Sequence, residues 1–247
     1  MEIIVNMRKL ILGIFTLASA QAVANQCDEP AKWAMATYAQ VAYSDNPQQR
    51  HRTLTLWRKP NNVAHQYPQL EITQAWQSVR PDTVKPIRYF DAHERAIEYQ
   101  PGELIHGKRD TNWSEHNQLI SDTLLRSMRL THQDGIGCDK VEHYVLNHRD
   151  GSIKVAWLAQ KKLVKTMVIE NNTRREEFTL QHIHHNKAAI SAFFEHRDKY
   201  KSTDYADIGD DHTDPFLTNM VHQGFIEAGA SGFYQANGEP LPTVHAH

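Results

Sequence analysis

Two histidines near the end of an extended segment are the first residues in this chain that could do chemistry. His182 and His184 are two residues apart, so in a β-strand their imidazoles would point from the same face and could bind one metal ion. The surrounding pattern supplies no third ligand, and the chain contains 16 histidines in all. A copper or zinc site that starts from this pair is therefore one hypothesis, and solvated residues at a strand end are the simpler interpretation.

An acidic run, DYADIGDDHTDP, begins at Asp204 and could supply oxygen ligands to calcium. A helix–loop–helix calcium loop needs oxygen ligands at its first, third and fifth positions and a glutamate at its twelfth. Counting from Asp204 puts Ala206, Ile208 and Pro215 at the last three of those places. The run is better interpreted as a capped, hydrogen-bonded loop between helices.

Local motifs for catalysis and for phosphate binding are absent from the sequence. There is no G-x-S-x-G and no G-x-G-x-x-G, so neither a nucleophile elbow nor a dinucleotide-binding loop is indicated. The formal net charge of −2 with intermixed signs also differs from the distinctly basic surface that binds nucleic acids. A hydrolase that uses scattered histidines and aspartates stays open as a third hypothesis, with no cofactor implied.

Large apolar residues recur along segments that look extended, and together they could form a binding surface. They are Trp57, Trp76, Tyr89, Trp157 and Met167. A highly curved sheet could gather such side chains into an apolar concavity that binds an acyl chain or a hydrophobic segment. The alternative is that they form the ordinary core beneath the helices.

The segment 141–183 carries the strongest fold signal and reads as four strands joined by tight turns. Asp150-Gly151 separates two alternating runs, which is among the strongest short-range signals of a β-hairpin. Period-two patterns also begin at Arg52 and predict a first half of the same sheet. Its expected strands are 52–59, 63–67, 70–79, 85–90 and 95–99.

Helical patterns accompany these strands. Residues 30–41 place Trp33, Tyr38 and Val41 on one helical face, and shorter helical turns are expected between 114 and 128. Two more helices are expected after the meander, over 187–200 and from Asp214-Pro215 to 220 or 222. The fold class predicted is α+β, with a strongly curved antiparallel sheet or half-barrel covered by helices.

The first 24 residues are typical of a secretory signal. Arg8 and Lys9 precede the apolar run 10–17, and Ala22-Val23-Ala24 provides a small-x-small cleavage site. The run is too short to span a bilayer. We expect a soluble periplasmic protein without stable transmembrane insertion, in which residues 25–247 form a single domain with a helical and loop-rich C-terminal part.

The chain has two cysteines, Cys27 and Cys138. In an oxidising compartment a disulfide between them is the simple expectation. It would tie the N-terminal segment to the loop before the meander.

The order of these elements resembles the periplasmic lipoprotein-carrier superfamily, which includes LolA, LolB and RseB. The closest local match is Leu54-Thr55-Leu56-Trp57-Arg58-Lys59-Pro60-Asn61-Asn62-Val63, similar to a carrier strand that ends in basic-basic-Pro-Asn, and 87–99 looks like the next hairpin. The resemblance implies a half-barrel plugged by helices that binds a lipid, an acyl chain or a lipoprotein segment without catalysis. In the carriers the second basic residue is an arginine that hydrogen bonds to the plugging helices, and Lys59 stands at that place here.

Overall fold

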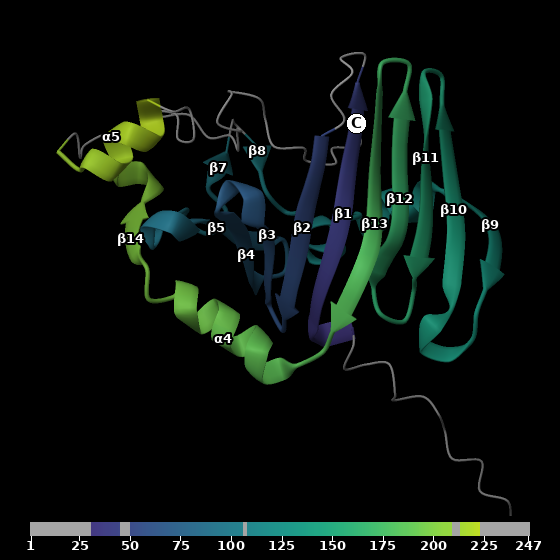
Figure 1. Cartoon of the computed structure of the whole chain (residues 1–247), viewed down its shortest axis with the longest axis horizontal. Coiled ribbons are helices and arrows are strands. Elements are labelled where there is room, and N and C mark those ends of the chain that lie inside the picture. Colours follow the sequence, from purple (N-terminus) through teal and green to yellow (C-terminus); the bar gives the residue numbers. More distant parts are fainter. Residues whose placement is uncertain (1–30, 45–49, 106–107, 209–212, 223–247) are drawn as a thin grey trace, which may run out of the picture.

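The computed structural model describes residues 31–44, 50–105, 108–208 and 213–222, and within them one large sheet dominates (Figure 1). Its twelve described strands lie in the order β14-β6-β5-β4-β3-β2-β1-β13-β12-β11-β10-β9. Every neighbouring pair is antiparallel except β14 with β6, which is parallel. The predicted signal segment and Cys27 lie outside the described residues, so export and the Cys27–Cys138 disulfide stay predictions.

The two halves of the sheet that the alternating patterns predicted are both present. The first half contains β2 (Arg50–Lys59), β3 (Asn62–Tyr67), β4 (Ile72–Arg80), β5 (Thr83–Phe90) and β6 (Arg95–Glu98). The second half is the meander of β10 (Val141–His148), β11 (Gly151–Leu158), β12 (Leu163–Asn171) and β13 (Arg174–His184). A glycine is required at 151, because a Cβ atom there would lie 2.0 Å from the Glu170 carbonyl oxygen.

The N-terminal helix predicted for 30–41 is wrong, because this segment is strand β1 (Ala34–Ser44). It joins the two halves of the sheet by pairing with β2 on one side and β13 on the other. Ala34, Ala36 and Tyr38 alternate along it and are fully buried. The apolar residues of this segment fit both a helical and a period-two pattern, and pairing on both sides selects the strand.

Strands at both edges of the sheet were not predicted. β9 (Arg129–Asp134) pairs with β10, and β14 (Lys201–Asp204) pairs with β6. A two-stranded ribbon of β7 (Leu104–Ile105) and β8 (Lys108–Arg109) is separate. The edge strands are short and polar, so their sequences lack an alternating apolar pattern.

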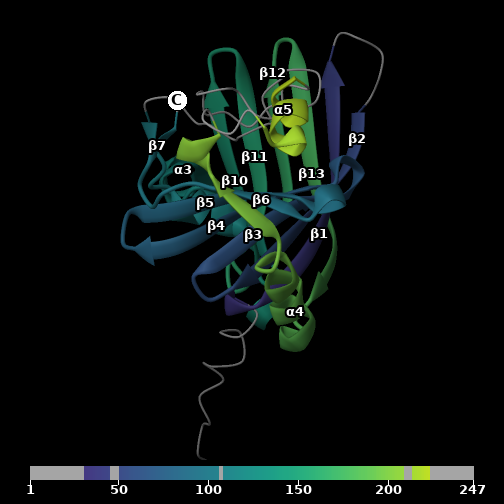
Figure 2. The same cartoon turned by 90° about the vertical axis from the view of Figure 1, so that its left-hand side faces the viewer.

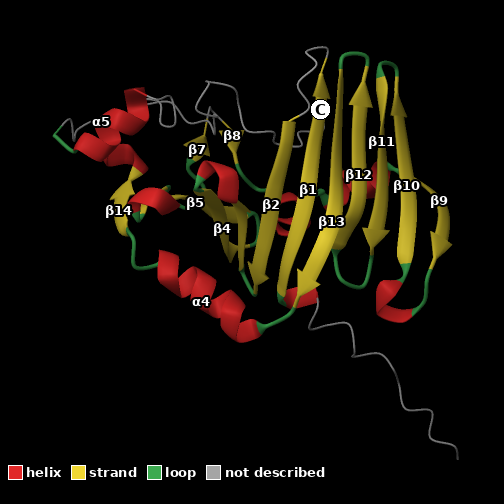
Figure 3. Ribbon diagram, in the orientation of Figure 1, coloured by secondary structure: helices red, strands yellow, loops and turns green. Residues whose placement is uncertain are grey.

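Short helices cover the sheet at several places (Figure 3). The helices are α2 (Trp113–Gln118), α3 (Asp122–Ser127), α4 (Lys187–Arg197) and α5 (Pro215–His222), and the 3-10 turns are η2 (Pro68–Leu70), η3 (Asp91–His93), η4 (Gly137–Asp139) and η5 (Tyr205–Asp207). None of the helices in the described ranges is long and apolar enough to cross a membrane.

The sheet is strongly curved. In Figure 2 strands β3 to β5 run almost across β10 to β13, which stand behind them. One apolar cluster contains residues of β4 and β5 together with residues of β10 and β11, although six strands lie between β4 and β10 in the sheet order. Both ends of the sheet therefore turn toward the same core, and the face that carries this cluster is concave. The predicted fold class is confirmed.

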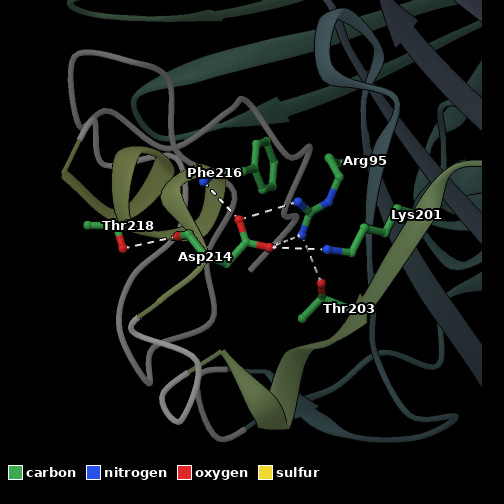
Figure 4. Close-up of polar contacts among 6 residues, drawn as sticks. All are labelled: Arg95, Lys201, Thr203, Asp214, Phe216 and Thr218. Carbon is green, nitrogen blue, oxygen red and sulfur yellow. Dashed lines mark hydrogen bonds and ion pairs between the residues drawn. The ribbon is translucent and has the colours of Figure 1, made fainter.

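An ion pair fixes α5 against the β14 edge (Figure 4). Asp214 precedes the helix and accepts from the Phe216 backbone N–H at 2.9 Å and from Arg95 Nη2 at 2.7 Å. The same Arg95 nitrogen donates to Thr203 Oγ1 of β14 at 3.2 Å. A strand, its parallel neighbour and a helix start are thus joined through one carboxylate.

Asp214→Asn is expected to reduce acid sensitivity. The Arg95 hydrogen bond is the main cause that lowers the pKa of Asp214 from 3.8 to about 2. Because the folded pKa lies below the unfolded one, the stabilisation is present above about pH 4 and is lost as the pH falls toward 2. The variant keeps a good N-cap, so we expect it to be less stable by about 1–2 kcal/mol at pH 7 and equal to wild type near pH 2. Urea unfolding at both pH values measures this, and a difference that does not change with pH contradicts it.

Candidate functional site

The concave face of the sheet carries the largest apolar surface in the described part of the chain. We call it the concave cluster. Its buried members are Ala34, Ala36, Tyr38, Leu54, Leu56, Val63, Tyr67, Trp76, Val84, Leu119, Ile120, Leu124, Met128, Val141, Ile153, Val155, Ala156, Trp157, Leu158, Leu163, Val164, Met167 and Phe178.

Part of this cluster comes from two short helices, α2 and α3, which we call the plug (residues 113–128). Ser121 caps α3 with its Oγ, which accepts from the Leu124 N–H at 3.0 Å. The capping residue and the left-handed Leu119 (φ 65°) make a sharp corner between the helices. Leu119, Ile120, Leu124 and Met128 are buried against the strands, so the plug fills the concave face with its own side chains.

Arg58 connects the plug to both halves of the sheet. Its side chain is only 1% exposed. Nη1 donates to the carbonyl oxygens of Asn117 in α2 at 2.9 Å and of Lys162 at 2.8 Å, and Nη2 donates to that of Lys161 at 2.8 Å. Burial lowers the pKa of Arg58 to about 10, so the guanidinium stays charged at neutral pH. Charged donors make strong hydrogen bonds, and we call this group of contacts the latch.

The latch corrects the expectation for Lys59. Side chains alternate between faces along β2, and Leu54, Leu56 and Arg58 are buried on the concave side. Lys59 therefore points to the opposite face, where its Nζ lies 4.7 Å from the centre of the Phe194 ring of α4. The basic residue that bonds to the plug is the first of the pair, and it is an arginine.

A polar group at the first turn of the plug packs against β3 and β4. His65 is buried and donates from Nε2 to the His116 carbonyl oxygen at 2.7 Å, and burial lowers the pKa of His65 to about 3, so it is neutral. The His116 ring stacks on Trp76 with centroids 4.1 Å apart and bonds Asp110 at 2.7 Å. Burial also raises the pKa of Glu115 to about 7. The plug therefore holds a carboxyl that titrates near neutral pH.

The curved sheet brings only some of the predicted ligand-binding residues together. Trp76, Trp157 and Met167 are all buried in the concave cluster. Trp57 and Tyr89 lie on the opposite face, which α4 covers, and the Trp57 ring stacks on Phe193 at 4.0 Å. Because side chains alternate along β2, Arg58 faces the concave cluster and its neighbour Trp57 faces α4.

A small cavity lies on the α4 face. Its volume is about 190 Å³, which is below the roughly 300–1,000 Å³ of typical ligand pockets. It is lined by Lys59, Asn62, Ala75, Trp76, Gln77, Ile87, Tyr89, Phe194 and Asp198. This cavity is too small for an acyl chain, and the concave face is the better candidate for apolar binding.

The predicted metal pair is exposed at the end of β13. His182 and His184 are separated by two positions on that strand, as expected. Within the described ranges neither belongs to a group of three side chains close enough to hold one ion. The adjacent His185 instead uses Nδ1 to donate to the Trp33 carbonyl oxygen at 2.7 Å.

Neither a protein-family model nor a curated protein sequence matches the chain. Solved structures do match, at low identity. One is PNGF-II in the P21 space group, with 14% sequence identity, a TM-score of 0.38 and coverage of 73% of this chain and 33% of that chain. The chain thus spans about a third of the length of the PNGF-II chain.

Two further matches have similarly low identities, and the first of them is a LolA superfamily protein. The LolA superfamily protein NE2245 from Nitrosomonas europaea shares 11% identity over 64% of this chain and 89% of that chain, with a TM-score of 0.32. The MucA/MucB complex of Pseudomonas aeruginosa shares 10% identity over 64% and 53%, with a TM-score of 0.30. Both similarities are weak and partial.

Proposed function

We propose that this chain is an exported, non-catalytic binding protein that holds an acyl chain, free or as part of a lipid or lipoprotein, on the concave face of its sheet. The observation that carries the proposal is the plug. Two six-residue helices occupy the concave face, and the first of them is joined to the strands by few polar contacts, among them those from Arg58 to the Asn117 carbonyl oxygen and from His65 to the His116 carbonyl oxygen. An apolar ligand can take the place of such a segment without disrupting the sheet.

The burial free energy of the plug side chains and that of an acyl chain are of similar size. Four plug side chains, Leu119, Ile120, Leu124 and Met128, are buried, and burial of such side chains is worth about 6–12 kcal/mol in total. Each buried methylene of a ligand contributes about 0.8 kcal/mol, so an acyl chain of about 14 methylenes contributes about 11 kcal/mol. Exchange of the plug for an acyl chain is therefore close to balanced, as reversible binding requires.

Export and a soluble periplasmic location are part of the proposal. They are supported by the signal-like segment 1–24 and by the pair Cys27 and Cys138. We assign residues 25–247 to one mature domain, whose partner is the hydrophobic ligand or the lipoprotein that carries it.

Weakening the plug is expected to tighten acyl-chain binding. Leu124→Ala removes a buried plug side chain (5% exposed) and destabilises the plug by about 2–4 kcal/mol. Because plug and ligand compete for one surface, the dissociation constant of a fluorescent fatty acid should fall about tenfold or more. Fluorescence titration measures the constant, and native mass spectrometry of the purified protein shows whether an acyl ligand is bound.

Ile190→Ala is the matched control. Ile190 lies on α4, packs on the opposite face and is 1% exposed, so its truncation costs similar stability without touching the concave cluster. We expect no change in affinity for this variant. Equal tightening in both variants, or no fatty-acid binding by any of them, contradicts the proposal.

A further inference from the structure

A second cluster of chemically active side chains lies on the outer edge of the sheet. His132 and Asp134 are two residues apart on β9, and His143 is paired with His132 on β10. One possible ligand atom from each of the three lies within 4.8 Å of the others. We propose that these residues bind a divalent transition-metal ion, of which Zn²⁺ is the representative, since two imidazoles and a carboxylate are a donor set that suits it.

The backbone of β9 is irregular at this place. His143 pairs with His132 and Tyr144 pairs with Leu130, so Thr131 is the extra residue of a β-bulge. Neighbouring side chains in a regular strand point to opposite faces, yet Thr131 Oγ1 lies 3.1 Å from His132 Nδ1. Bulges change the direction of side chains in this way, and here the bulge brings a hydroxyl beside an imidazole.

The Thr131 hydroxyl sets the proton position on His132. It donates its hydrogen to the His143 carbonyl oxygen at 3.0 Å, so toward His132 it accepts from Nδ1–H at 3.1 Å. The lone pair of His132 is then on Nε2, the atom left to bind an ion. A hydrogen bond from the remaining ring nitrogen is the usual support of a metal-binding histidine.

The other two ligands already contact each other. His143 Nε2 donates to Asp134 Oδ2 at 2.7 Å, and the His132 and His143 rings stack with centroids 4.0 Å apart. Binding of M²⁺ at His143 Nε2 would take the place of the hydrogen that this atom shares with Asp134: a neutral His143 then carries its one proton on Nδ1, and a protonated His143 releases one proton to solvent. Ligand atoms in a tetrahedral zinc site are about 3.3 Å apart, and small rotations of the exposed His132 and Asp134 side chains on the edge strand β9 can bring their ligand atoms this close to His143.

This site is separate from the proposed acyl site. None of its three residues belongs to the concave cluster, and they lie on the last two strands of the sheet, β10 and the edge strand β9. The side chain of Asp134 is 56% exposed and that of His143 is 29% exposed, which leaves an ion free access and a fourth coordination position open to water. The site also shares no residue with the His182 and His184 pair.

The experiment counts bound Zn²⁺ in tag-free protein by isothermal titration calorimetry, with Co²⁺ absorption as the readout of coordination. We expect His132→Gln and His143→Gln each to bind one Zn²⁺ fewer than wild type and to lose the Co²⁺ visible bands. Thr131→Val keeps a β-branched residue but no hydroxyl, and should weaken binding about tenfold, as loss of such supporting groups typically does.

The matched control is the double variant His182→Gln, His184→Gln, which should keep the wild-type stoichiometry. Circular dichroism spectra establish that each variant is folded, which exposed positions favour. Unchanged stoichiometry in His132→Gln overturns the proposal, and so does loss of the ion in the control alone.

Discussion

Replacing Arg58 with leucine is expected to lower the free energy of unfolding by about 3 kcal/mol and to free the plug from the sheet. The substitution removes the donors from three carbonyl oxygens, those of Asn117, Lys161 and Lys162. Each buried acceptor left without a donor costs about 1–3 kcal/mol, and relief of the desolvated charge offsets part of that loss. The loss should appear both at the plug and at the turn between β11 and β12, because α2 contributes one of the three acceptors and that turn contributes the other two.

Two measurements test the latch. Urea unfolding gives the change in stability, and hydrogen exchange should show faster exchange of the amides of α2 and of the β11–β12 turn at denaturant concentrations where the strands of the meander stay protected. Arg58→Lys keeps the charge but replaces a planar fork with a point charge, so we expect an intermediate loss of about 1–2 kcal/mol.

Lys59→Leu is the control that tests whether the effect is specific to the basic residue on the concave face. Lys59 lies next to Arg58 but on the α4 face, over Phe194, so its replacement should change stability by less than about 1 kcal/mol and leave α2 exchange unaltered. If Lys59→Leu released the plug and Arg58→Leu did not, the latch would be assigned to the wrong residue.

The resemblance to the carriers placed the latch one residue too late, at Lys59 instead of Arg58. The carrier motif located the right strand end, but a single-residue shift in a strand changes the face on which a side chain lies. Leu54 and Leu56 show which of the two basic residues lies on the concave face, because Arg58 continues their alternation and Lys59 does not. The motif alone could not show which of two adjacent basic residues faces the plug.

The β10–β11 hairpin was predicted correctly because its turn residues are characteristic. Asp150-Gly151 fixes the β10–β11 hairpin, and the period-two runs on either side fix the direction of its side chains. The helix prediction for residues 30–41 was wrong because Ala34, Ala36 and Tyr38 fit a helical period and a strand period equally well. Alanine also favours helices in isolation. Only the pairing of β1 with both neighbours, a long-range effect, determines its state.

The sequence did not reveal the proposed metal-binding group for a related reason. His132 and Asp134 have the same spacing of two residues as His182 and His184, but the segment 129–134 lacks an apolar pattern and was not recognised as a strand. The third ligand, His143, comes from the neighbouring strand, in a register that the bulge at Thr131 sets. A search for histidines and carboxylates two residues apart in any segment next to a predicted strand would have found the group.

The plug should respond to pH through Glu115. Burial is the main cause that raises the pKa of this carboxyl from 4.5 to about 7, and Asp110 adds to it. Because the folded pKa lies above the unfolded one, the contribution of Glu115 to stability is fully present below about pH 4.5 and is lost as the pH rises through 7. We therefore expect Glu115→Gln to stabilise the protein by about 1–2 kcal/mol at pH 8 and by much less at pH 5.

The difference between wild type and Glu115→Gln isolates this one group. His65 also titrates against the plug, with its pKa lowered to about 3, but it is present in both proteins and cancels. Under the proposed competition of plug and ligand for the concave face, wild type should bind a fatty acid more tightly at pH 8 than at pH 5, and the variant should lose most of that dependence. Equal stabilisation of the variant at both pH values would mean that Glu115 is already ionised in the folded plug at pH 5, and the plug would then be no pH-dependent competitor.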